Sequence, residues 1–265
     1  MPDPAALVAL ATDVAARAVD LLRDGEEHGR ATATSKSTAT DMVSEMDRAS
    51  ERLIVEALLA ARPDDGIVGE EGAARAGTSG LRWVIDPLDG TTNYLYGLPG
   101  WNVSIAAEDA DGVVAGVVAD AVRAEVFTAT RGGGAFLDGR SITCSTADDL
   151  GTALIGTGFG YAVERRRAQG RVVGGLLPLV RDIRRAGAAA LDLCSVACGR
   201  LDGYYEKGLS WWDLAAGGLV ATEAGATLSS LDGQPVRAGA VVAAGPRLIT
   251  PLRDALSALG AYDVP

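Results

Sequence analysis

One segment, residues 83–93, constrains the fold more than any other part of the chain. It reads Trp-Val-Ile-Asp-Pro-Leu-Asp-Gly-Thr-Thr-Asn, so an apolar strand leads directly into two acids that stand three residues apart. Pro87 fixes the turn between Asp86 and Asp89, and we expect both carboxylates to point into one cavity. The chain must therefore fold so that a buried strand ends in a pair of acids.

Such a pair has a specific chemical implication. Two like charges this close repel strongly at low dielectric, and a bound divalent cation makes the arrangement tolerable. Oxygen ligands at irregular loop positions suit Mg²⁺. If Gly90-Thr91-Thr92 opens a helix, the free N–H groups of its first turn form an anion site beside the cations. The segment suggests a metal with a phosphate, although two aspartates that cap a turn would show the same spacing.

Other catalytic residue types are scarce. The one histidine, His28, lies in a polar stretch, and we expect a solvated surface residue. Cys194 and Cys198 lie one helical turn apart among apolar neighbours, and we expect both to be core residues. A histidine-based triad and a His/Cys zinc site do not fit this inventory. Catalysis must rest on carboxylates, hydroxyls and a cation.

The charge balance bears on the partners. The 265 residues include 24 Lys or Arg and 35 Asp or Glu, for a formal net charge of −11. Because nucleic-acid affinity comes largely from Lys and Arg that displace counterions, we expect no nucleic-acid partner. No apolar run approaches the roughly 20 residues that span a bilayer, and the first apolar stretch predicts an amphipathic helix rather than a signal peptide. Three cysteines without a CxxC pair favour a reducing compartment, so we expect a cytoplasmic protein without membrane association.

The pattern of elements changes along the chain. Amphipathic spacing predicts a helix over about 4–23, followed by a polar connection, and Ser44 with Asp47 resembles a capping box that opens a second helix ended by Pro63. A sheet with hairpins should follow, and from about residue 140 strands and helices alternate. We therefore expect an α+β or α/β protein of two packed subdomains, 1–140 and 141–265. The expected strands are near 67–68, 83–85, 103–107, 113–118, 153–155, 204–205, 227 and 240, and the later helices near 162–180, 188–199, 213–224 and 246–258.

Further acids stand where a site can form. Glu70 and Glu71 directly follow a predicted strand, and Asp213 stands at the expected start of a helix. Taken alone, Asp213 could be an N-cap, and Asp47 could be only the third residue of its capping box. The combination is far more specific than its parts.

Together these segments resemble the inositol monophosphatase family. Their order and spacing match over nearly the whole chain, including the Glu223-Ala224-Gly225 that closes the last motif. The resemblance implies the five-layer αβαβα sandwich of the sugar phosphatase type, a Mg²⁺-dependent and lithium-sensitive phosphatase, and a homodimer. The matching segments are Lys36, Asp41-Met42-Val43-Ser44-Glu45-Met46-Asp47, Gly69-Glu70-Glu71, residues 83–93 and Trp212-Asp213-Leu214-Ala215-Ala216-Gly217.

The resemblance also implies roles. Two Mg²⁺ ions would share Asp86, a third would sit near Glu70, and the Gly90 and Thr91 amides would grip the phosphate. Thr91, hydrogen-bonded to Asp47, would orient and help to deprotonate the attacking water. Lys36 matches a family lysine near the metal site, with a surface role as the alternative. In this assignment the catalytic residues are Asp47, Glu70 and Thr91; the ligands are Glu70, Asp86 and the Leu88 carbonyl for one ion and Asp86, Asp89 and Asp213 for the second; and the substrate contacts are Asp89, Gly90, Thr91, Gly187, Ala189, Glu206 and Asp213.

Substrate choice is expected in the second half. Glu206 matches the family acid that accepts hydrogen bonds from the inositol ring, and residues 186–189 match a stretch whose backbone touches the polyol. The family often has Thr where this chain has Ala188. A solvated strand-end acid is the alternative for Glu206, and we expect Tyr204 and Tyr205 to pack rather than bind.

The sequence thus predicts an enzyme that hydrolyses myo-inositol monophosphate to inositol and phosphate, by direct attack of water and with two to three Mg²⁺ ions per site. Phosphatases of the same superfamily that act on histidinol phosphate, fructose 1,6-bisphosphate or a 3′-phosphoadenosine nucleotide share its fold and metal motif. Glu206 favours a neutral, hydroxyl-rich substrate over a nucleotide. A binding role in RNA-polymerase complexes, in which some bacterial relatives are implicated, stays open beside catalysis.

Overall fold

The computed structural model describes residues 3–36, 42–236 and 239–264, and Asp41 of the second matching segment lies outside them. None of its helices is long and apolar enough to cross a membrane, within these residues. The helices are α1 (Pro4–Asp24), α2 (Glu26–Ala31), α3 (Glu45–Ala61), α4 (Thr91–Tyr96), α5 (Val163–Leu176), α6 (Ala189–Ala197), α7 (Trp211–Glu223) and α8 (Ile249–Ala258).

The larger sheet has mostly antiparallel neighbours. Its order is β10-β9-β8-β7-β6-β5-β3-β4, and only β3 and β5 are parallel neighbours. The predicted hairpin is confirmed between β6 and β7, whereas the strand at 67–68 joins its neighbour in parallel. The strands are β3 (Gly66–Gly69), β4 (Ala74–Arg75), β5 (Arg82–Asp89), β6 (Asn102–Asp109), β7 (Gly112–Asp120), β8 (Glu125–Thr130), β9 (Gly134–Leu137) and β10 (Arg140–Ser141).

The second sheet is smaller and mixed. Its order is β12-β11-β13-β15-β14, with β11 parallel to both of its neighbours and the remaining pairs antiparallel. A separate short ladder joins β1 (Thr34–Ser35) to β2 (Met42–Val43). The strands of the smaller sheet are β11 (Leu154–Thr157), β12 (Asp182–Arg184), β13 (Gly203–Leu209), β14 (Thr227–Ser229) and β15 (Gly239–Ala244).

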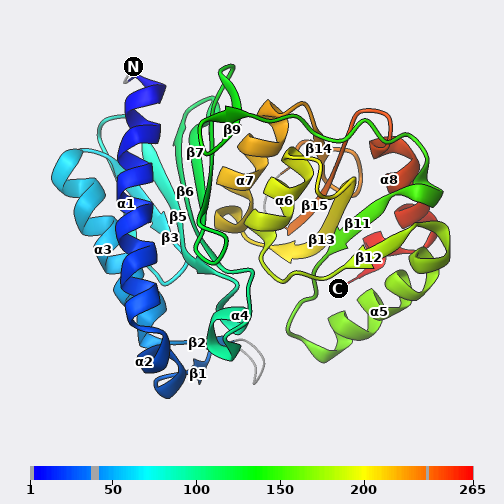
Figure 1. Ribbon diagram of the computed structural model, residues 1–265, viewed down its shortest axis with the longest axis horizontal. Helices are drawn as coiled ribbons and strands as arrows, with labels where there is room; N and C mark the ends of the chain where they lie inside the picture. Colours follow the sequence, from blue (N-terminus) through cyan, green and yellow to red (C-terminus); the bar gives the residue numbers. More distant parts are fainter. Residues whose placement is uncertain (1–2, 37–41, 237–238, 265) are drawn as a thin grey trace.

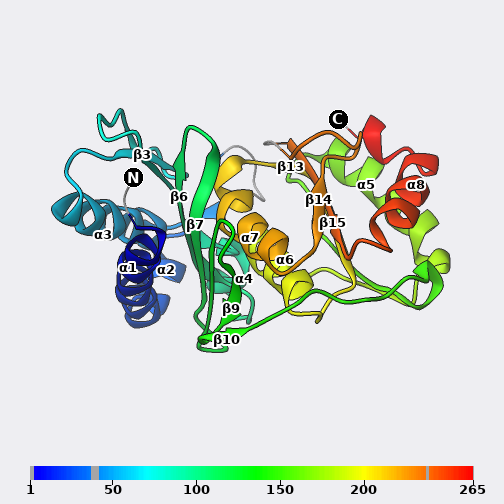
Figure 2. The same cartoon turned by 90° about the horizontal axis from the view of Figure 1, so that it is seen from above.

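Helices and sheets alternate in layers, as Figures 1 and 2 show. α1 and α3 cover one face of the larger sheet, α6 and α7 lie between the two sheets, and α5 and α8 lie on the far side of the smaller sheet. The predicted mixed fold of helices and sheets is confirmed. The larger sheet can bury both faces in this arrangement, which explains why its central strands β5, β6 and β7 are mostly buried.

Alternation along β5 divides its side chains between two cores. Trp83 and Ile85, each 0% exposed, pack in the core beneath α1 and α3, whereas Val84 packs on the side of α6 and α7. A third core lies between the smaller sheet and the outer helices α5 and α8. β5 therefore spans the boundary at which the site can form.

The first two long helices begin as the sequence predicts. Asp3 accepts a hydrogen bond from the Ala5 amide (3.0 Å) before α1. The predicted capping box of α3 is confirmed, because the Ser44 amide donates to Asp47 Oδ2 (2.8 Å) and the Ser44 side chain accepts from the first turn. These caps satisfy amides that lack partners within the helix.

The structure confirms some local predictions and corrects others. The polar stretch after α1 contains the helix α2, where His28 is exposed and its Nε2 lies 2.9 Å from Glu45 Oε2. α5 ends at Leu176, because Pro178 lies in a 3₁₀ turn at 177–179. Cys194 and Cys198 are free thiols; Cys194 is buried as predicted, whereas Cys198 is only half-buried. Tyr204 and Tyr205 are buried as predicted.

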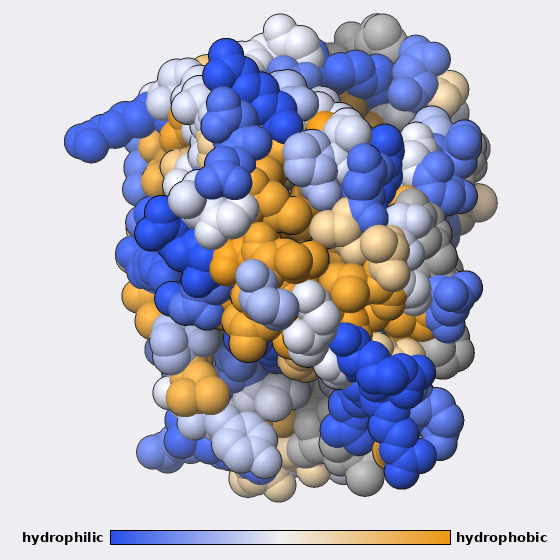
Figure 3. Space-filling view, turned by 90° about the vertical axis from the view of Figure 1, so that its right-hand side faces the viewer, coloured by the Kyte–Doolittle hydropathy of each residue, from blue (hydrophilic) through white to orange (hydrophobic). Residues whose placement is uncertain are grey.

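The end of the molecule formed by α5 and α8 has a partly apolar surface. Figure 3 shows a band of hydrophobic side chains there, bordered by hydrophilic ones. Among the exposed large apolar residues, Leu177 and Leu179 belong to the turn that follows α5.

Candidate active site

A β-bulge in β5 turns Asp86 and Asp89 to the same face of the larger sheet. In a regular strand, residues three apart point to opposite faces. Here Asp86 pairs with Ser104 and Asp89 with Asn102, so three steps along β5 match two steps along β6. The extra residue reverses the alternation, and both carboxylates join Val84 on the side of α6 and α7. Pro87 is tolerated inside this strand because a bulge interrupts the ladder.

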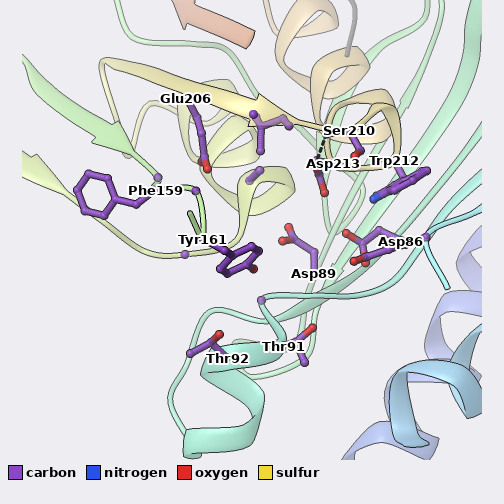
Figure 4. Close-up of a pocket in the computed structure, with 18 of the residues that line it drawn as sticks. Asp86, Asp89, Thr91, Thr92, Phe159, Tyr161, Glu206, Ser210, Trp212 and Asp213 are labelled. Carbon is purple, nitrogen blue, oxygen red and sulfur yellow. Dashed lines mark hydrogen bonds between the residues drawn. The ribbon is translucent and has the colours of Figure 1, made fainter. Parts of the chain in front are cut away.

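The start of α7 brings Asp213 to the same cavity. The Ser210 amide donates to Asp213 Oδ2 at 2.6 Å, so Ser210 is the N-cap and Asp213 is the third residue of the helix. The alternative of Asp213 as the N-cap is therefore wrong. Figure 4 shows Asp213 facing Asp86 and Asp89 across the cavity.

Glu70 reaches the cavity from the end of β3. Its amide donates to the Ile85 carbonyl of β5 (3.2 Å), which fixes the residue beside the acidic pair. Lys36 Nζ lies 2.8 Å from Glu70 Oε1 and 2.5 Å from Glu71 Oε1, so Lys36 lines the cavity while it stays partly exposed to solvent. Burial lowers the pKa of Lys36, but the two carboxylates raise it by a larger amount. The net shift is upward, so the ammonium stays charged.

Thr91 and Asp47 meet although they stand 44 residues apart. Gly90 takes a left-handed φ of 89° and is the N-cap of α4, so residues 90–92 do open a helix. Thr91 Oγ1 then lies 2.9 Å from Asp47 Oδ1 and 3.1 Å from the Leu88 carbonyl oxygen. Burial raises the pKa of Asp47, although the hydrogen bonds from Ser44 and Thr91 lower it in part. The hydrogen bond implied by the resemblance is present.

Glu70, Asp86, Asp89 and Asp213 line one side of the cavity, which we call the acidic wall. Burial raises the pKa values of its three aspartates. Burial, then the charges of Glu70, Asp89 and Asp213, raise the pKa of Asp86 well above its usual range. Burial also raises the pKa of Asp213, and it raises that of Asp89 to about 6 against the hydrogen bonds from Asn102 and Ala190. Such a cluster holds protons unless a cation neutralises it.

Glu206 forms the opposite wall of a cavity of about 320 Å³. Tyr204 and Glu206 stand two residues apart in β13 and therefore lie on the same face of the strand. The Tyr204 hydroxyl donates to Glu206 Oε2. The carboxylate lies directly over Gly158, where a Cβ would stand 1.8 Å from Oε2. Burial raises the pKa of Glu206 to about 7, against the Tyr204 bond and the charge of Arg185. The alternative of a freely solvated acid does not hold.

The predicted backbone contacts lie at the start of α6. Gly187 and Ala189 both line the cavity, and Gly187 has a φ of 95°. The Ala190 amide donates to Asp89 Oδ2 (2.9 Å), and the Ala189 amide also stabilises the ionised form of Asp89. The Ala189 amide is thus directed at a carboxylate of the site.

The sequence interpretation missed part of the wall near Glu206. The Arg185 guanidinium lies 5.8 Å from the centroid of the Phe159 ring, and both residues line the cavity. Outside the cavity, Trp211 donates from Nε1 to Glu108 Oε2 (2.8 Å). The only sequence signal for this wall was a run of arginines at 165–167 and 184–185. The additional lining residues are Thr92, Gly158, Phe159, Gly160, Tyr161, Arg165, Arg185, Gly208, Leu209, Ser210 and Trp212.

Comparison with known proteins identifies the family. The model of the inositol monophosphatase family matches residues 3–258. The chain belongs to this family. It is 47% identical to an inositol-1-monophosphatase of Mycobacterium leprae, over 84% of this chain and 80% of that protein. It is 39% identical to the Nus factor SuhB of Pasteurella multocida, over 91% of each chain.

A solved structure supports the assignment to the inositol monophosphatase family. The extragenic suppressor protein SuhB of Bartonella henselae superimposes with a TM-score of 0.90 at 35% identity, over 95% of this chain and 98% of that one. As a family member, the chain is a metal-dependent phosphoric monoester hydrolase.

The carboxylates of the site are not arranged as a complete set of metal ligands in this structure. In the described part of the chain, no three His, Cys, Asp or Glu side chains converge as a group that could hold an ion. Other partners engage the acids instead: Lys36 binds Glu70, and backbone amides bind Asp89 Oδ2 and Asp213 Oδ2. Glu70, Asp86, Asp89 and Asp213 nevertheless line one cavity.

Proposed function

We propose that this chain hydrolyses myo-inositol monophosphate to inositol and phosphate with the help of Mg²⁺. The observation that carries the proposal is the division of the cavity. Buried acids stand on one wall and suit cations and a phosphate, whereas Glu206 on the other wall suits a substrate rich in hydroxyls. The relatives named inositol-1-monophosphatase support this choice of substrate.

The donor set of the acidic wall fits Mg²⁺. Its members present only oxygen atoms, the ligand type that Mg²⁺ prefers. Burial and mutual repulsion raise the pKa values of Asp86 and Asp213, and a bound cation relieves such a cluster. We assign Glu70, Asp86 and the Leu88 carbonyl to one ion, Asp86, Asp89 and Asp213 to a second, and the surroundings of Glu70 to a third.

The chain's own residues provide the proton path. When bound, Mg²⁺ supplies charge neutralisation, a lowered pKa for water and stabilisation of the leaving alkoxide. Thr91 donates its proton to Asp47, which leaves the lone pairs of Thr91 Oγ1 free to accept a proton from the attacking water. Ser44 holds Asp47 in place through its amide and its hydroxyl (2.6 Å). Thr91 therefore orients the water, and Asp47 receives the proton.

The start of α4 provides the phosphate contacts. The Tyr94 amide donates to the Gly90 carbonyl, which is the first bond of the helical i→i−4 pattern in α4. The amides that precede Tyr94 in this turn take no part in that pattern. We assign the Gly90 and Thr91 amides to the phosphate oxygens, because N–H groups at a helix start favour anions.

Polyol recognition falls to the second wall. Glu206 would accept hydrogen bonds from ring hydroxyls, and the backbone of Gly187 and Ala189 would add polar contacts. Ala188, where the family often has Thr, removes one hydroxyl from this stretch. A nucleotide with further phosphates would meet the charge of Glu206, so the nucleotide phosphatase activity ranks lower.

A panel of phosphate esters tests the substrate assignment. We expect the kcat/KM of myo-inositol monophosphate to exceed those of histidinol phosphate, fructose 1,6-bisphosphate and 3′-phosphoadenosine 5′-phosphate at saturating Mg²⁺. A tenfold preference for one of these three would move the assignment to that ester and leave the metal-dependent chemistry intact.

A second role is favoured by the relatives named Nus factor SuhB. We propose binding to RNA-polymerase complexes as an addition to catalysis. It would not replace catalysis, because the acids of the site and Thr91 are all present. The test is co-purification of tagged chain with RNA-polymerase subunits from its native cells. If the tagged chain is fully active but no RNA-polymerase subunits co-purify with it, the second role is excluded and catalysis remains the only proposed function.

The remaining expectations form part of the same proposal. We propose that the layers form the five-layer αβαβα sandwich of the sugar phosphatase type. We also propose subdomains 1–140 and 141–265; the larger sheet ends at Ser141, one residue past this boundary, and the smaller sheet begins at Leu154. We also propose a cytoplasmic homodimer inhibited by lithium. Light scattering should then give twice the chain mass of 27.1 kDa.

A further inference from the structure

α3 presents three buried polar side chains on one face. Asp47, Ser50 and Glu51 are spaced so that they are neighbours on the helix surface, and they are 1%, 0% and 6% exposed. Asp47 binds Thr91, but Ser50 and Glu51 have no part in the proposed chemistry. Among the described residues that line the cavity, neither of the two appears.

Ser50 holds the bulge of β5. Its hydroxyl donates to the Pro87 carbonyl at 2.9 Å, a buried bond between residues 37 apart. Pro87 stands between Asp86 and Asp89, where the ladder with β6 changes register. A bulge leaves main-chain groups without their ladder partners, and Ser50 supplies one. The bond therefore fixes the turn that directs both aspartates to one face.

Glu51 holds the turn that carries Glu70. Its Oε2 accepts a hydrogen bond from the Glu71 amide (2.9 Å), and its Oε1 accepts one from the Ala73 amide (3.0 Å). A Cβ at Gly69 would stand 2.1 Å from Glu51 Oε2, so the carboxylate lies directly against the end of β3. Two charge-assisted bonds from one buried carboxylate restrain this turn strongly.

We infer that α3 sets the geometry of the acidic wall, with Ser50 and Glu51 as positioning residues. Ser50 positions the Asp86–Asp89 turn, Glu51 positions Glu70, and Asp47 positions Thr91. One rigid helix thus fixes three chain segments that are far apart in the sequence. The inference rests on the proposed function, because positioning has a consequence for Mg²⁺ only if these acids bind it.

Positioning and simple stabilisation lead to different measurements. A residue that only stabilises the fold lowers the unfolding temperature but leaves the affinity of folded molecules for Mg²⁺ unchanged. A residue that holds the ligands in place raises the dissociation constant of Mg²⁺, because the acids must then be ordered when the ion binds. Mg²⁺ affinity without substrate is therefore the decisive quantity.

The experiment is calorimetric titration of chelator-stripped protein with MgCl₂ in the absence of substrate. Glu51→Gln keeps the shape but turns an NH₂ group toward one of the two amides, and we expect a Kd for Mg²⁺ about 5- to 30-fold higher than that of the wild type. Ser50→Ala removes one neutral bond, and we expect a rise of about 3- to 10-fold. The matched control is Glu56→Gln, the same change at an exposed position of α3, with an unchanged Kd.

Thermal unfolding of the same stripped preparations shows which variants are folded. If Glu51→Gln does not fold, Ser50→Ala carries the test. Folded variants whose Kd stays within twofold of the wild type would overturn the inference, while the proposed function would stand. A wild-type protein that binds no Mg²⁺ would overturn the proposed function, and the inference with it.

Discussion

Glu206 is the residue on which recognition of a polyol depends. With a pKa raised to about 7, mainly by burial, its carboxyl group is largely protonated below neutral pH and ionised above it. The Tyr204 hydroxyl occupies Oε2, so Oε1 is the atom left for a substrate hydroxyl. The ionised form accepts the stronger hydrogen bond, and preference for a polyol ester should therefore increase with pH through about 7.

Glu206→Gln should weaken recognition without affecting the chemistry. The charge is lost and the shape kept, which costs about 1–2 kcal/mol of hydrogen bonding. We expect kcat/KM for myo-inositol monophosphate to fall about 5- to 30-fold, and its rise with pH to disappear. With p-nitrophenyl phosphate, which lacks ring hydroxyls, the same preparation should lose little activity. Equal losses with both esters would show that Glu206 supports the fold or the acidic wall instead.

Thr91→Val should remove the proton path. Valine keeps the shape of threonine but lacks the hydroxyl bonded to Asp47, and positioned proton transfer contributes about 10²- to 10⁴-fold to a rate. We expect kcat to fall within that range with little change in KM. Thr92→Val is the matched control, since Thr92 also lines the cavity. A kcat for Thr91→Val within threefold of the control would contradict the role of the Thr91–Asp47 pair.

At the scale of elements, the sequence predicted those features that depend on neighbours along the chain. α1 and α3 follow from amphipathic spacing and from the Ser44–Asp47 capping box. β9 and β10 were missed because they are short, and β8, β9 and β10 all depend on pairing with β7 and with one another, which no local pattern shows. The same reason applies to the site. The acids were found through local motifs, but Lys36 on Glu70 and Arg185 over Phe159 arise only where separate segments meet.

The start of α4 depends on Gly90. Its φ of 89° is unfavourable for other residues, and a Cβ there would stand 2.5 Å from the Gly100 carbonyl oxygen. Gly80, with a φ of 83° and no atom near its missing Cβ, carries the backbone strain alone. We expect Gly80→Ala to cost about 1–2 kcal/mol of unfolding free energy, and Gly90→Ala to cost clearly more and to lose activity. Equal costs in denaturant titrations would show that contact with Gly100 is unimportant.

For the whole molecule, the buried acids make the metal-free protein less stable as the pH rises from mildly acidic to neutral. Asp86, Asp89, Asp213 and Glu206 all have raised pKa values, so the native state binds more protons than the unfolded state. Stability is then present near pH 4 and is lost as the pH rises through about 6 for Asp89 and about 7 for Glu206. Acids with lowered pKa values, such as Asp65 and Glu125, lose their contribution only at lower pH.

Thermal unfolding at pH 5, 6, 7 and 8 measures this effect. We expect the unfolding temperature of stripped protein to fall across the series. With saturating Mg²⁺ the fall should be smaller or absent, because ligands that bind only the native state stabilise it and compete with protons for the acids. A stripped protein that gains stability steadily from pH 5 to 8 would contradict the assignment of the buried acids.

The central claim is that these acids bind Mg²⁺ for hydrolysis of a phosphate monoester. The most direct test is the rate of phosphate release from myo-inositol monophosphate by exhaustively chelated protein, before and after addition of Mg²⁺. We predict no release above background from the stripped protein and full recovery on addition of Mg²⁺. Undiminished turnover by the stripped protein would contradict the claim.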